Sequence, residues 1–227
     1  MEILFAILII VIAIGLIVIA RVRNVLKGEQ LRKLMHLICI LALGVWIFLF
    51  KTWIPSVIAM AIVMIILFPT FVFLEKSDKL DRFLMARKKG EIPLSLLAVG
   101  FMFMVVVIVC EVIFGSKLLA LASIYAWGPG DAAAALIGKK FGRHKWGKDK
   151  KKSMEGSTAM FITSLISTGI ILYLYAEGIS AGIIGAIVVT ALAAAVSELF
   201  SENGLDTIIC PFSSMAVLLL MLHITGS

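Results

Sequence analysis

Carboxylates, lysines and arginines gather at three places in an otherwise apolar chain, and proteins hold divalent cations and phosphate groups with these side chains. Asp131, the first of them, follows Gly128-Pro-Gly inside an apolar stretch. Because proline lacks an amide N–H and clashes with the preceding turn, we predict a broken helix near Gly128–Asp131. Broken helices at membrane depth line a cavity or are buried in protein, and a carboxylate there indicates function. A purely structural cap for the helix that restarts after the break is the alternative.

The second place is the basic segment 139–152, with eight Lys and Arg residues in fourteen positions, more than membrane orientation requires. Asp131 and Glu155 flank this segment. Gly156-Ser-Thr then opens an apolar stretch, where amide groups at a helix N-terminus favour a phosphate; simple helix initiation is the alternative. Glu155 could bind a metal, accept a hydrogen bond from a ribose, or take a proton from a hydroxyl group.

The third place is the acidic segment 198–206, which contains Glu198, Glu202 and Asp206 but no basic residue. A turn at Asn203-Gly204 separates Glu198 from Asp206, so the two carboxylates could face each other. Mg²⁺ prefers one or two carboxylates plus phosphate oxygens, so the segment is a candidate metal site; a solvated acidic turn is the alternative. A weaker candidate is His36, a proton shuttle, a phosphate contact or a structural histidine.

Membrane helices must position these groups. Of the 227 residues 62% are apolar and 15% are charged, and the mean hydropathy is +1.12, whereas soluble domains contain roughly 45–50% apolar residues. This composition excludes a disordered chain, a disulfide scaffold and almost any soluble domain. A span needs about 20 apolar residues, and candidate spans lie at 3–20, 35–50, 53–74, 93–113, 117–138, 157–175, 179–199 and 211–225.

We therefore predict an all-α, polytopic membrane helix bundle of about 7–8 transmembrane helices, forming a single integral-membrane catalytic domain over residues 1–227. The second and last spans are short enough to be tilted, re-entrant or packed inside the bundle, and Cys210-Pro211 is expected to open the last one. The small residues after Asp131, four alanines and Gly138, are expected to permit close helix packing.

Basic residues are distributed asymmetrically about these spans. Segments 21–33, 75–91 and 139–152 hold 19 of the 21 Lys and Arg residues, and they follow spans one, three and five. The positive-inside rule makes this side cytoplasmic, places the N-terminus outside, and puts all the candidate chemical groups on the cytoplasmic face.

In their order along the chain these motifs resemble the polyprenol kinase family. The family includes dolichol kinase, phytol kinase and CTP-dependent diacylglycerol kinase, and it is distantly similar to phosphatidate cytidylyltransferases. The resemblance is carried by Gly130-Asp131 through Gly142-Arg-His-Lys, by Lys152-Ser153-Met-Glu155-Gly156-Ser157, and by Glu198…Asn203-Gly204-Leu-Asp206…Pro211. Arg32-Lys33…His36 resembles a pattern near the family's N-terminus. Thr207 departs from the family, which often has Asn after this Asp.

The resemblance implies transfer of the γ-phosphate of CTP to the hydroxyl group of a membrane lipid, either diacylglycerol or a polyprenol or isoprenoid alcohol, with Mg²⁺ as cofactor. On this basis the expected catalytic residues are Asp131, Glu155 and His36. The expected nucleotide contacts are Lys140, Arg143, Lys152, Ser153, Gly156 and Asn203, and the expected metal ligands are Asp131, Glu198 and Asp206.

The expected partners are CTP and a lipid alcohol in the bilayer; no nucleic acid is expected, and the chain could form a homo-oligomer. Two other functions compete with the kinase. One is synthesis of a CDP-lipid with pyrophosphate as product. The other is ion-coupled transport with Asp131 as the ion site, since broken helices and buried acids also mark transporters.

Overall fold

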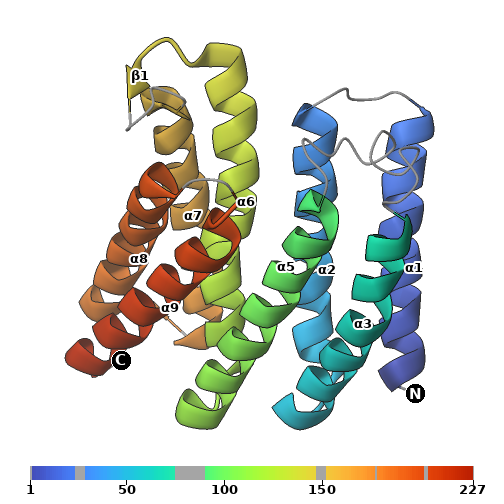
Figure 1. Cartoon of the computed structure of the whole chain (residues 1–227). Helices are drawn as coiled ribbons and strands as arrows, with labels where there is room; N and C mark the ends of the chain where they lie inside the picture. The colour runs from blue at the N-terminus through green and yellow to red at the C-terminus, as the bar shows by residue number, and fades with distance from the viewer. Residues whose placement is uncertain are drawn as a thin grey trace. The chain divides into compact units, whose positions relative to one another are not determined.

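A computed structural model describes residues 2–23, 29–74, 90–146, 152–176, 178–201 and 204–226 (Figure 1). Within these residues the chain forms eight α-helices, one π-helical turn and one two-stranded hairpin. It divides into two compact units, Met1–Ile108 and Val109–Ser227. The prediction of a single catalytic domain stays a prediction.

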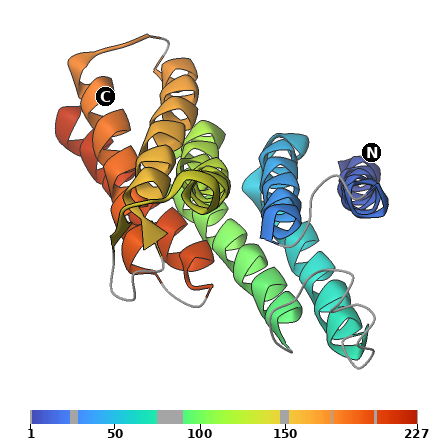
Figure 2. The ribbon, with the colours of Figure 1, turned by 90° about the horizontal axis from the view of Figure 1, so that it is seen from above.

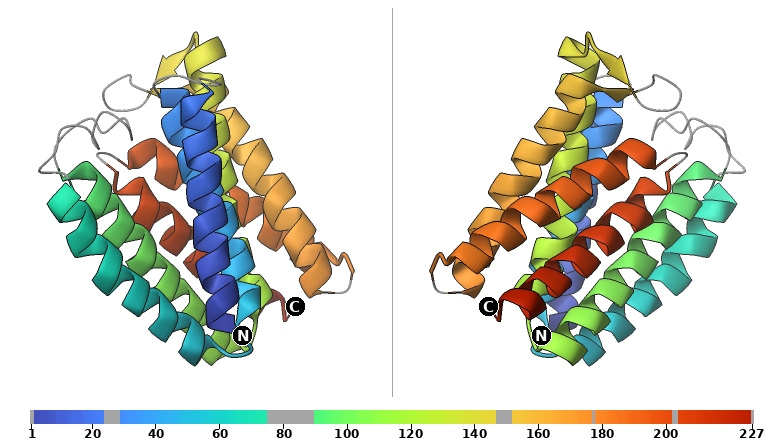
Figure 3. Two further views of the ribbon diagram at one scale, coloured as in Figure 1. Left: turned by 90° about the vertical axis from the view of Figure 1, so that its right-hand side faces the viewer. Right: turned by 90° about the vertical axis from the view of Figure 1, so that its left-hand side faces the viewer.

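The first unit contains α1 (Glu2–Val22), α2 (Glu29–Leu49), α3 (Trp53–Leu74) and α5 (Glu91–Ile108). In this unit α1 packs on α2, α2 on α3 and α3 on α5, and both views of Figure 3 show α3 and α5 side by side. Arg32 of α2 pairs with Glu91 at the start of α5, with Nη1 and Oε1 3.6 Å apart. Because α2 begins at Glu29, Arg32 and His36 lie inside its first turns.

The second unit begins with a π-helical turn, η1 (Val109–Ile113), and contains α6 (Lys117–Phe141), α7 (Met154–Tyr175), α8 (Ala181–Phe200) and α9 (Asp206–Thr225). These four helices pack in a closed order, α6 on α7, α7 on α8, α8 on α9 and α9 on α6, and Figure 2 shows them grouped together. The largest fully buried side chains inside this unit include Trp127, Met160, Leu172 and Ile183. An antiparallel hairpin of β1 (Lys145–Trp146) and β2 (Lys152–Ser153) connects α6 to α7.

The described helices confirm the predicted all-α polytopic membrane bundle. Each of the eight candidate spans overlaps a described helix, and the fourth covers both α5 and η1. Six helices in the described part of the chain are long and apolar enough to cross a membrane: α2, α3, α5 with η1, α7, α8 and α9. The helix α1 holds a shorter apolar stretch, Leu4–Ala20, and α6, which carries several charges, is not among the six. The expectation that the second and last spans are short is wrong, since α2 has 21 residues and α9 has 20. Pro211 lies inside α9 and does not open it.

The predicted break near Gly128–Asp131 is also wrong, because α6 continues without interruption through Pro129. Proline cannot donate to the carbonyl four residues earlier, which belongs to Tyr125. The Ser167 hydroxyl of α7 donates to that carbonyl at 2.8 Å, and the Ser164 hydroxyl donates to the carbonyl of Ala126. Hydroxyl groups of a neighbouring helix thus satisfy the backbone around Pro129, as membrane helices require. Asp131 is therefore an interior helical residue and not a helix cap.

Because Ser167 supplies the hydrogen bond that Pro129 cannot, we predict that the loss of stability caused by Ser167→Ala depends on the residue at position 129. Ser167→Ala should lower the free energy of unfolding by roughly 0.5–1.5 kcal/mol, because the Tyr125 carbonyl loses its donor. In a Pro129→Ala background the helix regains an amide donor for this carbonyl, so the same substitution should cost clearly less. Thermal unfolding in detergent measures both effects. An equal loss in both backgrounds would contradict the coupling; Ser213→Ala, whose hydroxyl bonds within its own helix, is the control.

Candidate functional site

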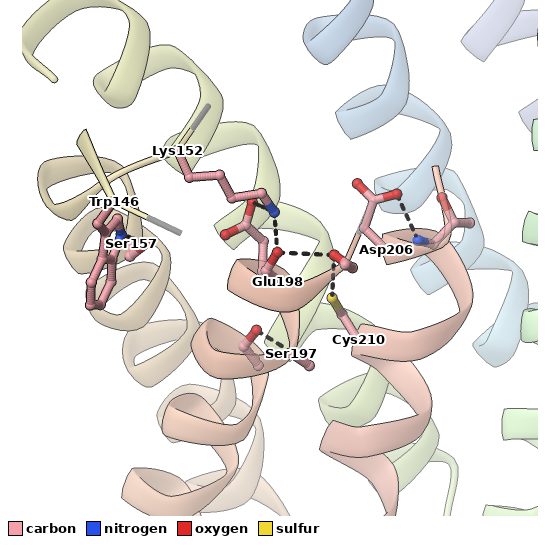
Figure 4. A network of polar contacts seen from close by, with 10 residues as sticks. Trp146, Lys152, Ser157, Ser197, Glu198, Asp206 and Cys210 are labelled. Atoms are coloured by element: carbon pink, nitrogen blue, oxygen red, sulfur yellow. Dashed lines mark hydrogen bonds and ion pairs between the residues drawn. The ribbon is translucent and has the colours of Figure 1, made fainter. Parts of the chain in front are cut away.

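Polar side chains gather at one end of the second unit, where α6 leads into α7 and α8 leads into α9. We call the described residues of 142–155 and 198–207 the polar end. Lys152, next to the start of α7, reaches Glu198 near the end of α8, so the two connections meet although they are 46 residues apart in the chain (Figure 4). Predicted site residues from both segments are therefore neighbours.

Lys152 and Glu198 form the central ion pair of the polar end. The Lys152 Nζ lies 2.6 Å from the Glu198 Oε1, and it also donates to the Glu198 backbone carbonyl. The two side chains are 27% and 11% exposed, so the pair is largely shielded from water. Ser201 donates to the same carbonyl through its hydroxyl at 3.0 Å. Lys152, a predicted phosphate contact, and Glu198, a predicted metal ligand, are thus bound to each other.

Asp206 lies at the first position of α9, beside this pair in Figure 4. Its Oδ1 accepts the Thr207 amide at 3.1 Å, and its side chain is half-buried. Glu198 lies near the end of α8 and Asp206 at the start of α9, and the facing of their two carboxylates stays a prediction. Asn203, the predicted nucleotide contact in that turn, lies outside the described residues.

Glu155, in the first turn of α7, bonds back to the residues that follow α6. Its Oε1 accepts the backbone amides of Arg143 and His144 at 3.1 and 3.2 Å. The same oxygen lies 2.8 Å from the His144 Nδ1. A neutral His144 ring that donates from Nδ1 keeps Nε2 as an acceptor. The sequence alone does not indicate this contact of His144, because the hairpin register decides it: Lys145 pairs with Ser153, and the Met154 amide donates to the His144 carbonyl at 2.9 Å.

Small residues let α6 and α7 approach closely here, which confirms the packing role predicted for Gly138. Ser153 caps α7, accepting the Gly156 amide at 3.1 Å, so this amide already has a partner at the helix start. A side chain at Gly156 would lie 2.9 Å from the Ala134 carbonyl, and one at Gly142 would collide with Gly138. The nucleotide roles of Ser153 and Gly156 stay predictions.

Close packing at Gly156 predicts opposite effects for two glycines of one helix. Gly156→Ala should destabilise the protein by about 1–3 kcal/mol, because the new methyl group meets backbone of α6. Gly169→Ala should be neutral or stabilising by up to about 1 kcal/mol, since alanine is the better helix former and the nearest atom would be 3.8 Å away. The thermal unfolding midpoints of the two variants in detergent test this prediction. Similar midpoints for Gly156→Ala and Gly169→Ala would contradict the close packing.

Asp131 is 3% exposed in the interior of α6. It precedes Lys139 by eight residues, a rise of roughly 12 Å along the helix. Trp127 and Ala134, about one turn away on either side, are buried as well. A buried carboxylate inside a membrane protein is energetically costly, so its presence supports a functional role.

The remaining predicted residues differ in their surroundings. Lys140 is exposed, with its Nζ 5.1 Å from the centre of the Phe141 ring. The Arg143 side chain is exposed, and the residue contacts Glu155 through its backbone. His36 belongs to the first unit, so its part in the site stays a prediction.

The carboxylates can be tested for their fit to Mg²⁺. Among the described residues, no three His, Cys, Asp or Glu side chains lie together as a ready metal site. Mg²⁺ seldom uses such a cage, however, because it keeps several waters and takes one or two carboxylates together with substrate phosphates. The buried Asp131 and Glu198 and the half-buried Asp206 supply hard oxygen ligands. The donor chemistry of these carboxylates suits Mg²⁺, and their joining in one site with nucleotide phosphates stays a prediction.

The helices and the polar end define an all-α multi-pass membrane protein with a charged site at one end of a helical unit. Comparison with known proteins makes this class more specific. The chain is 33% identical to a phytol kinase of Synechocystis sp. over 95 residues, 41% of this chain and 40% of that protein. It is 30% identical to a probable chloroplastic phytol kinase of Triticum aestivum over 132 residues, 54% of this chain and 43% of that protein.

These similarities support the coarser part of the predicted resemblance, a likeness to phytol kinases. The chain spans about two fifths of the length of these curated relatives. No family model matches it. No solved structure is significantly similar.

Proposed function

We propose that this protein is a lipid-alcohol kinase that transfers the γ-phosphate of CTP to the hydroxyl group of an isoprenoid alcohol in the membrane. The similarity to two phytol kinases carries the proposal and favours an isoprenoid acceptor over diacylglycerol. The meeting of both charged segments at the polar end agrees with it, because phosphoryl transfer depends mainly on positioning and charge neutralisation. By the positive-inside rule the basic segment favours the cytoplasmic face for this end, where CTP would be available.

In the proposed reaction the hydroxyl oxygen of the lipid attacks the γ-phosphorus. A new O–P bond forms, and the bond from the γ-phosphorus to the bridging oxygen breaks. CDP leaves with the electron pair of the broken bond, and the hydroxyl proton passes to a base of the protein. Of the residues predicted to act on the acceptor, Glu155 lies at the polar end.

The basic and acidic residues would bind different parts of the nucleotide and its metal ion. Lys140, Arg143 and Lys152 would bind its phosphates, and Asp131, Glu198 and Asp206 would hold Mg²⁺. When bound, the metal ion would neutralise charge on the phosphate oxygens. Lys152 and Glu198 are paired with each other, so we expect binding of the nucleotide with its metal to exchange that pair for two new ones, ammonium with phosphate and carboxylate with metal.

The proposal is tested by the products. Purified protein in detergent is incubated with CTP, Mg²⁺ and an isoprenoid alcohol such as phytol, with diacylglycerol and ATP as alternative acceptor and donor. We expect CDP and a lipid monophosphate, with the isoprenoid alcohol and CTP preferred. Pyrophosphate would show cytidylyl transfer instead, and the absence of turnover with every pair would overturn the kinase.

A further inference from the structure

Two adjoining cavities, both shallow and open to the molecular surface, lie at the start of α7. The first has a volume of about 530 Å³ and is lined by His144, Met154, Glu155 and Thr158. The second, of about 230 Å³, runs between α7 and α8; Phe161, Leu192 and Val196 are among the residues that line it. Met154 and Thr158 line both cavities, so the two lie side by side.

The two cavities differ in chemistry. The polar side chains of His144 and Glu155, which are hydrogen-bonded to each other, line the first cavity, whereas most residues that line the second are apolar. Trp146 of the hairpin lines the second cavity, and its indole N–H donates to the Ser157 hydroxyl at 3.2 Å (Figure 4). This bond holds the Trp146 ring in the wall of the second cavity, and tryptophan, with an apolar ring and one N–H donor, suits a membrane interface.

The apolar cavity lies where lipid can reach it. Both α7 and α8 are long and apolar enough to cross a membrane. On α8, Leu192 and Val196 are 52% and 44% exposed, so the cavity is an open groove on the side of this helix pair. A hydrocarbon chain could enter it from the bilayer without crossing the protein.

We propose that these cavities form the acceptor site, with the hydrocarbon chain of a lipid alcohol between α7 and α8 and its hydroxyl group at the His144–Glu155 pair. This inference rests on the proposed function and names the place where its acceptor binds. A polar head and an apolar tail on one molecule match the two halves of the site.

In this arrangement His144 accepts the hydroxyl proton. Glu155 occupies Nδ1, and Nε2 is the nitrogen left to receive a proton from the lipid. A carboxylate that orients a histidine in this way is a recurrent device for general bases. Glu155 is then a positioning residue for His144, and the proton goes from the hydroxyl oxygen to Nε2 as the O–P bond forms.

The groove is tested by a matched pair of valines on α8. Val196 lines the groove and Val188, two turns earlier, does not, while the two are 44% and 41% exposed. Val196→Trp should raise the KM for the lipid alcohol at least tenfold and leave the KM for CTP within about twofold. Val188→Trp should change neither. Equal effects of the two substitutions in an active enzyme would overturn the groove.

A binding measurement separates failure of the groove from failure of the proposed function. An isoprenoid alcohol with a photoreactive diazirine in its tail is added without CTP, and the crosslinked peptides are identified by mass spectrometry. We expect labelling of residues 154–161 and 192–199, with a clear loss in Val196→Trp. Labelling confined to other helices overturns the acceptor site even if the enzyme is a kinase. Labelling at the groove without any phosphorylation would overturn the kinase and retain the site.

The polar half is tested at His144. His144→Gln should lower kcat by about 100-fold or more, the usual contribution of a general base, while crosslinking of the tail continues. Lys145→Gln, the neighbouring change, removes an exposed cation and should leave kcat within about twofold. An unchanged kcat in His144→Gln would remove this histidine from the acceptor site.

Discussion

Asp131→Asn is expected to abolish phosphoryl transfer while the protein still folds and inserts into the membrane. The amide keeps the shape of the carboxylate, which suits a position that is 3% exposed inside a continuous helix, but it loses the charge that would hold Mg²⁺. Charge stabilisation by a metal ion contributes several kcal/mol to a transition state, and each 1.36 kcal/mol is about tenfold in rate. We therefore expect kcat to fall on the order of 1000-fold, measured as CDP released with a saturating lipid alcohol.

A second acid-to-amide change provides the control. Glu111 lies in η1, before α6 begins and thus away from the polar end, and its carboxylate is outside the proposed site. Glu111→Gln should keep activity within about twofold. Circular dichroism and the thermal midpoint show whether each variant is folded. Activity near the wild-type level in a folded Asp131→Asn protein would remove Asp131 from the metal site.

Lys152→Met is expected to weaken both CTP use and stability. Hydrogen bonds to charged groups contribute about 1.5–3 kcal/mol, so the loss of a phosphate contact should lower kcat/KM for CTP roughly 10- to 150-fold. The substitution also leaves Glu198 largely buried without its ammonium partner. Removing one partner of a fully buried pair costs about 3–5 kcal/mol. With Lys152 27% exposed we expect about 1–3 kcal/mol, read from thermal unfolding.

A charge swap distinguishes a functional pair from a structural one. Lys152→Glu combined with Glu198→Lys reverses the pair, so it should recover part of the lost stability. It should not recover activity, because the phosphates of CTP would then meet a carboxylate where they need an ammonium group. Lys139→Met, an exposed cation at the end of α6, is the control for the loss of one positive charge. Recovery of both stability and CTP use in the swapped protein would show that the pair is only structural.

Much of the fold could be predicted from the sequence, because apolar length alone largely decides where a chain crosses a membrane. The eight predicted stretches all became helices, and two of the errors fell at prolines. Pro129 and Pro211 are both inside helices, although local chemistry treats proline as a helix breaker. At Pro129 the reason lies in α7, whose Ser164 and Ser167 donate to carbonyls of α6.

The sequence by itself therefore determined where the helices lie and that they are apolar. It also showed which charged residues lie inside apolar segments, where a charge is energetically costly. Both follow from side-chain chemistry along the chain. Only the tertiary structure decided which charges meet. Lys152 and Glu198 are paired across 46 residues because the start of α7 and the end of α8 lie at the same side of their unit. His144 reaches Glu155 because the hairpin register places it there. Such contacts depend on helix packing and strand register, which local residue types do not specify, and the proposed acceptor site rests on them.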